Sequence, residues 1–212
     1  MKTSIALKTL LGAGALTLPL LAFAESNVQT GAATATPGAT AHLDFSIVIP
    51  KILYLRVGTG SGYTTGALTS VNTIDLITFS PAAGTVGNGT AVAGTGGDLT
   101  GGVETAAIVS NSGNVTLNAT ASGALSNGSG DTIPFTQINT VASALTSGTQ
   151  LPAPTLTNGT SSNVLLTAPA TKLIVQDAKW TYSYANASNV PAGTYGGVNV
   201  NNGRVTYTAT MP

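Results

Sequence analysis

The chain has 212 residues, no cysteine and only 7% charged residues, with seven bases and seven acids. Ordinary globular proteins carry about 25% charged residues, so Thr, Ser and Asn must supply most of the polar surface. This composition offers no basic patch for nucleic acid or anionic lipid, and zero cysteine excludes disulfides, thiol catalysis and Cys-ligated metal centres.

The N-terminus has the pattern of a secretion signal. Lys2 and Lys8 form a positive leader, residues 10–21 are mostly apolar, and residues 22–24 (AFA) fit a small-x-small cleavage site. The apolar stretch is shorter than the about 20 residues that a membrane span needs. We therefore predict that the signal peptide 1–24 is removed. The mature chain is then exported to the periplasm, cell surface or extracellular space, with no transmembrane span.

A flexible arm and an alternating segment follow. Residues 25–40 are small and polar, and we predict a flexible N-terminal arm there, before a single β domain over residues 41–212. Pro50 separates two alternating runs, 41–49 and 51–57, because proline cannot donate to a strand ladder. We expect two strands, or one strand bent at the proline. The large apolar residues of the first run alternate with mostly polar ones: Leu43, Phe45, Ile47 and Ile49.

The rest of the chain reads as short strands separated by turn-forming residues. Residues 81–102 and 140–162 are rich in small and polar residues and are expected to be long loops, and residues 111–113 a turn. Helical periodicity is scarce outside the signal, so we predict an all-β fold, an antiparallel immunoglobulin-like β-sandwich. The further strand candidates are 71–79, 103–110, 114–121, 133–138, 164–167 and 173–184.

The C-terminal segment predicts a β-hairpin. Val198 and Val200 alternate with polar residues, Asn202-Gly203 has the residue types of a type I′ turn, and apolar residues alternate with Arg and Thr up to residue 211. We expect two paired strands that close the domain, the second over 203–211.

Three groups of residues resemble parts of known sites. His42, Asp44 and Ser46 share one face of the 41–49 run and are interpreted as a polar strand face. The Gly-rich stretch 58–62 lacks the following helix and lysine of a phosphate loop and is interpreted as a strand connection. Asp98 and Glu104 bracket a Gly-rich loop without the spacing of a calcium motif. We therefore predict no catalytic, cofactor-binding or metal-binding residues, no cofactor, and no enzyme activity.

Aromatic residues at alternate positions of the 173–184 run have two interpretations. Trp180, Tyr182 and Tyr184 fall on one face of the strand. They suit either a stacking platform for sugars or a hydrophobic core, and a core position is favoured because aromatics there bury a large area.

The closing segment resembles that of bacterial fimbrial subunits and their spore-coat-U-like relatives. The similarity lies in residues 191–195 (PAGTY) and 203–210 (GRVTYTAT), together with the signal peptide and the β-rich body. The resemblance implies an incomplete immunoglobulin-like sandwich that accepts a strand from the next subunit. The expected donor is the arm at 25–40.

We therefore expect an exported structural subunit of a surface fibre or extracellular layer, assembling by strand exchange. Its expected partners are further copies or related subunits, and a chaperone or assembly machinery. The alternative is a secreted binding module, an adhesin or carbohydrate-binding domain, that uses the loops 81–102 and 140–162.

Overall fold

A computed structural model describes residues 26–33, 38–60, 62–63, 68–146 and 148–212. The chain divides at Ile49–Pro50 into two units. We call the described residues before that point the arm, and residues 50–212 the body. The predicted signal peptide lies outside the described residues. Among those residues, no helix is long and apolar enough to cross a membrane.

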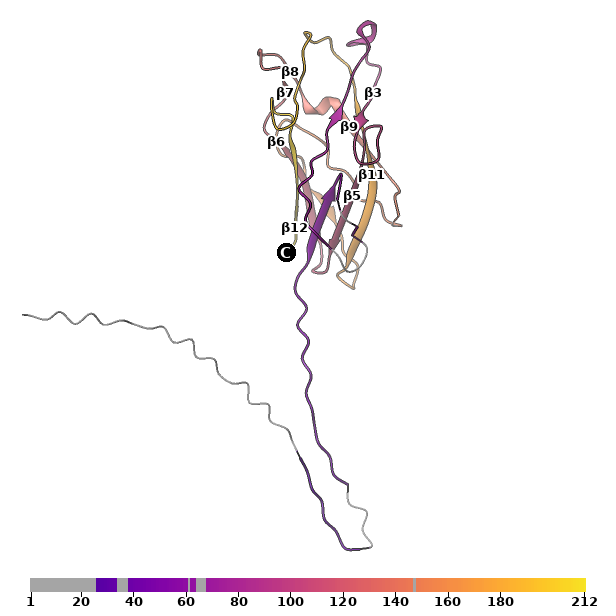
Figure 1. The fold of residues 1–212 in the computed structure, drawn as a ribbon, viewed down its shortest axis with the longest axis vertical. Helices are drawn as coiled ribbons and strands as arrows, with labels where there is room; N and C mark the ends of the chain where they lie inside the picture. Colours follow the sequence, from indigo (N-terminus) through magenta and orange to yellow (C-terminus); the bar gives the residue numbers. More distant parts are fainter. Residues whose placement is uncertain (1–25, 34–37, 61, 64–67, 147) are drawn as a thin grey trace, which may run out of the picture. The chain divides into compact units, whose positions relative to one another are not determined.

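Antiparallel strands make up the body, which confirms the all-β prediction (Figure 1). The larger sheet has the order β1-β5-β11-β3, and β9 also pairs with β11; the smaller sheet has the order β10-β6-β12. The larger sheet contains β1 (Leu53–Val57), β3 (Val92–Ala93), β5 (Val103–Ser110), β9 (Ile138–Ser143) and β11 (Ile174–Tyr184). The smaller contains β6 (Val115–Ala121), β10 (Val164–Leu166) and β12 (Val205–Thr210).

Short elements occupy the connections. β2 (Ile77–Thr78) pairs with β4 (Thr95–Gly96), and β7 (Leu125–Ser126) pairs with β8 (Thr132–Ile133). Two 3₁₀ helices complete the described set, η1 (Ala83–Thr85) and η2 (Phe135–Gln137). The predicted loop 81–102 therefore contains η1, β3 and β4, and the predicted strand 133–138 is mainly η2.

The two sheets contribute to one hydrophobic core. Along β6 the side chains alternate between buried and half-buried, with Val115 and Leu117 fully enclosed. Trp180 of β11 is also fully buried; its indole Nε1 donates to the Leu151 carbonyl at 2.8 Å, and its ring lies 5.3 Å from that of Tyr207 on β12. Tyr182 and Tyr184 are buried as well. The core interpretation of these three aromatics is confirmed.

The turn at residues 111–113 connects the sheets instead of closing a hairpin. β5 pairs with β1 and β11, whereas β6 pairs with β10 and β12. The Asn111 side chain accepts a hydrogen bond from the Ile52 N–H at 2.8 Å and donates one to the Pro50 carbonyl at 2.9 Å. This turn therefore fixes the start of the body.

The expected strand at 41–49 is not formed. These residues are extended and exposed, carry no ladder, and belong to the arm, so that the body begins at Pro50 rather than at residue 41. A strand needs a partner for its main-chain groups, and alternation in the sequence does not supply one. Similarly, the 71–79 candidate forms a ladder only at Ile77–Thr78.

The predicted C-terminal hairpin is also wrong. β12 pairs with β6, and residues 193–204 contain no strand. The expected turn is present one position earlier: the Gly203 N–H donates to the Val200 carbonyl at 2.8 Å, and Asn201 and Asn202 have φ values of 51° and 60°. Val198 and Val200 are exposed, so their alternation with polar residues did not reflect a buried face.

The core predicts a clear difference between two substitutions in neighbouring strands. Leu117→Ala removes a fully buried side chain between the sheets and is expected to lower the free energy of unfolding by about 2–5 kcal/mol. Thr208→Ala, on the exposed face of β12, is expected to change it by about 0.5 kcal/mol or less. Urea unfolding followed by Trp180 fluorescence measures both, and equal losses would contradict the assignment of the core.

Candidate functional site

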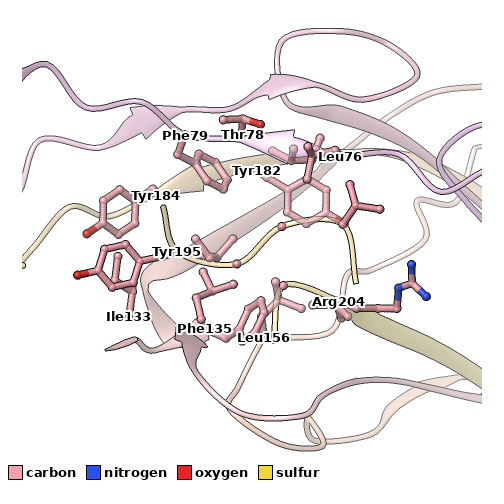
Figure 2. A pocket seen from close by; sticks show the side chains of 18 of the residues that line it. Leu76, Thr78, Phe79, Ile133, Phe135, Leu156, Tyr182, Tyr184, Tyr195 and Arg204 are labelled. Atoms are coloured by element: carbon pink, nitrogen blue, oxygen red, sulfur yellow. The ribbon is translucent and has the colours of Figure 1, made fainter. Parts of the chain in front are cut away.

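A groove of about 1100 Å³ opens between the two sheets of the body. One wall comes from β1 and the segment 73–81, and the other from the start of β12 and the loop 190–199. Figure 2 shows Leu76 and Phe79 facing Tyr182 on one side, and Tyr184, Tyr195 and Ile133 gathered at one end. Phe135 and Leu156 line it on the other side. The groove is thus a gap in the hydrophobic core, lined mainly by apolar and aromatic side chains.

The groove exists because two strands beside it lack a neighbour. Among the described strands, β1 pairs with β5 alone, and β12 pairs with β6 alone. In the described part of the chain, β1 and β12 are therefore edge strands of their sheets. Several apolar residues packed against the core are only half-buried here, among them Leu55, Val57, Ile77, Phe79, Val205 and Tyr207. A sheet edge of this kind is a template for another strand.

At one end β1 and β12 approach each other. The Lys51 ammonium donates to the carbonyl of Pro212 at 2.9 Å, and the Ser110 hydroxyl lies 3.7 Å from the sulfur of Met211. The groove therefore extends from this junction toward the N-terminal end of β12.

Two tyrosines are hydrogen-bonded along the groove. The hydroxyls of Tyr182 and Tyr207, from opposite sheets, share a hydrogen bond at 2.9 Å. Burial raises the pKa of Tyr207 to about 12 and raises the pKa of Tyr182 well above its usual range. Both hydroxyls therefore stay protonated at physiological pH, and their bond connects the two sheets across the groove.

An acidic cluster lies beside the groove at the end of β1. Gly58 has φ +85°, and any side chain there would clash with the carboxylates of Asp75 and Glu104, so this position requires glycine. Glu104 accepts a hydrogen bond from the Asp98 N–H at 3.2 Å. Asp98 forms an ion pair with Arg56 at 2.9 Å and accepts from the Thr105 N–H at 2.7 Å. Desolvation by burial, followed by the charges of Asp75 and Asp98, raises the pKa of Glu104 to about 8.

The structure places the three groups of residues that resembled parts of known sites as follows. His42, Asp44 and Ser46 lie on the arm and are exposed. In the glycine-rich stretch, the Thr59 N–H donates to the Asp75 carboxylate, which excludes an anion from that amide. Asp98 and Glu104 do come together, but the described residues contain no group of three or more His, Asp or Glu arranged to hold a metal ion.

Sequence reasoning missed the groove because its residues come from separate parts of the chain. The lining residues come from strands and loops that are far apart in the sequence, and the first and last of them are separated by more than a hundred residues. Examples are Leu55, Phe79, Tyr182 and Tyr207. The sequence offered one signal, the run at 41–49, which contains more large apolar side chains than is usual for an exposed segment. Comparisons with protein-family models, curated proteins and solved structures give no match for this chain.

The raised pKa of Glu104 predicts a pH-dependent stability. The unfolded carboxyl ionises near pH 4.5, whereas the folded one keeps its proton up to about pH 8. Below pH 4.5 the carboxyl is protonated in both states and does not lower the free energy of unfolding. As the pH rises from 4.5 to about 8, the unfolded state ionises first, and the free energy of unfolding falls by an amount on the order of a few kcal/mol. Glu104→Gln removes this fall in the free energy of unfolding, because glutamine does not ionise. In urea unfolding from pH 4.5 to 9, the variant should gain stability over the wild type as pH rises; a pH-independent difference would contradict the prediction.

Proposed function

We propose that this chain is an exported structural subunit of a surface fibre or extracellular layer, and that its subunits join by strand exchange. The observation that carries the proposal is the groove between β1 and β12, where the apolar core of the body is not covered by any strand of the described residues. In β-augmentation, an added strand gains main-chain hydrogen bonds from the edge and inserts alternate side chains into the groove.

The sheet order supports an immunoglobulin-like sandwich that lacks one strand. One sheet contains β1, β5, β11 and β9, and the other contains β10, β6 and β12, which corresponds to two antiparallel sheets packed over a common core. In such a sandwich one further strand would lie beside β12. Here β12 is at the edge of its sheet and pairs with β6 among the described strands.

The arm supplies a suitable strand at residues 41–49. Leu43, Phe45, Ile47 and Ile49 alternate along it and are 75–86% exposed, a costly arrangement for a segment with no partner. Burying each of these side chains is worth about 1.5–3 kcal/mol. The earlier part of the arm, which sequence reasoning favoured as the donor, offers Val28 and small residues. We therefore assign the donor strand to 41–49 rather than to 25–40.

Two substitutions on opposite faces of this segment test the proposal. Phe45→Asp places a charge on the face that would enter the groove and is expected to abolish assembly. Val48→Asp introduces the same charge on the opposite face, where the wild-type side chain is 89% exposed, and should leave assembly close to wild type. Light scattering of the purified mature chains measures both, and circular dichroism checks that the body stays folded.

Deletion of residues 26–33 is expected to preserve assembly, because this part of the arm contributes little apolar surface. Electron microscopy of the native cell surface, with and without the gene, tests the structural role itself. Identical surfaces and a strictly monomeric mature protein would contradict the proposal. Equal assembly of the Phe45→Asp and Val48→Asp chains would contradict the donor-strand mechanism alone.

A further inference from the structure

One basic side chain lies at the rim of the groove. Among the described lining residues, Arg204 is the one base, and Asp75 and Glu104 are the acids. Figure 2 shows the Arg204 guanidinium extending away from the aromatic side chains, at the end of the groove opposite Tyr184 and Tyr195. Within the described part of the chain, Arg204 has no ion-pair partner. The groove thus presents one positive charge at its edge.

The candidate donor segment carries one negative charge. Asp44 is the only acid between residues 41 and 49, and it is exposed. Its even position places it on the face opposite Leu43, Phe45, Ile47 and Ile49. Along β12 the even positions Thr206, Thr208 and Thr210 are likewise exposed, whereas the odd positions are half-buried toward the core. Arg204, just before β12, shares the even positions of these threonines but is half-buried at the groove rim.

Alternation alone leaves the register of such a strand undetermined. A slip of one residue turns every apolar side chain away from the core and is excluded. A slip of two residues keeps the apolar face inward and costs far less. The exposed side chains along β12 are threonines, which do not distinguish such slips, whereas Arg204 just before the strand carries a charge that does.

We propose that Asp44 of the entering strand pairs with Arg204 of the receiving body, and that this ion pair selects the register of subunit contact. The inference rests on the proposed function. Cross-strand pairs of opposite charge on one face stabilise a sheet, and like charges oppose it. The acid Asp75, which also lines the groove, opposes a register that would bring Asp44 beside it. Rim charges of this kind act mainly on specificity and association rate.

Charge reversal in full-length mature chains provides the test. D44R places an arginine beside Arg204, and R204D places an aspartate beside Asp44, so each variant alone should assemble about tenfold less well than the wild type at low salt. The double variant D44R/R204D should recover most of the loss. Lys179→Asp reverses an exposed base outside the groove lining and serves as the control.

Mixing the two single variants separates pairing from folding damage. The donor strand of the D44R chain suits the groove of the R204D chain, because the two reversed charges again attract each other. The donor strand of the R204D chain keeps Asp44 and likewise suits the groove of the D44R chain, which keeps Arg204. An equimolar mixture should therefore assemble where neither variant assembles alone. Light scattering with size-exclusion chromatography measures this. A normal R204D polymer, or impaired chains that mixing does not rescue, would overturn the pairing while leaving strand exchange intact.

Two other outcomes would remove the basis of the proposal. Wild-type assembly that persists in the Phe45→Asp chain would show that subunits join elsewhere, and the proposed mechanism would fail together with the pairing. A strictly monomeric wild type in which residues 41–49 resist proteolysis would show that the arm fills the groove of its own chain, and would overturn a second copy as the occupant.

Discussion

The structure depends on a core that two sheets share and that their strands do not fully enclose. Trp180 and Leu117 show how tightly the central part packs, with no exposed surface on either side chain. Toward β1 and the start of β12, apolar residues of the same core become half-buried and the main-chain edges lose their ladder partners. At this edge of the body, half-buried apolar side chains and main-chain groups without a ladder partner among the described strands therefore occur together. Both favour an additional strand.

This arrangement suits a chain with few charges and no cysteine. Ion pairs are sparse among the described residues, and Arg56–Asp98 is used to hold the connection after β1. Without disulfides, a free body depends on its packing alone. Filling the groove would add apolar burial where the body has least of it, so stability and assembly would be thermodynamically linked. We infer that a strand-exchange polymer of these subunits is more stable than the free subunit.

The sequence predicted the regular parts of the fold better than its connections. Strand β6 was recognised from its regular alternation, β5 and β11 were recognised as long runs bounded by turn-forming residues, and Trp180 was correctly assigned to the core. The hairpin at residues 193–211 was wrong, because Val198 and Val200 alternate without a buried surface to pack on. The strand expected at 41–49 was wrong for the described structure, because alternation in the sequence does not supply a ladder partner. Arg204 and the groove could not be predicted at all, because tertiary pairing alone brings those residues together.

The hydrogen bonds of Asn111 have a mechanical consequence for such a fibre. Pro50 and Ile52, which Asn111 holds, are the residues at which the arm meets the body. In a strand-exchange fibre of the proposed kind, tension on the arm of one subunit would enter its body at this point and continue into β1. Five residues of β1 are in register with β5, from Leu53 opposite Ser110 to Val57 opposite Ala106. A pull along β1 loads these bonds together as a shear rather than one after another, and the Asn111 clamp delays the separation of the first pair.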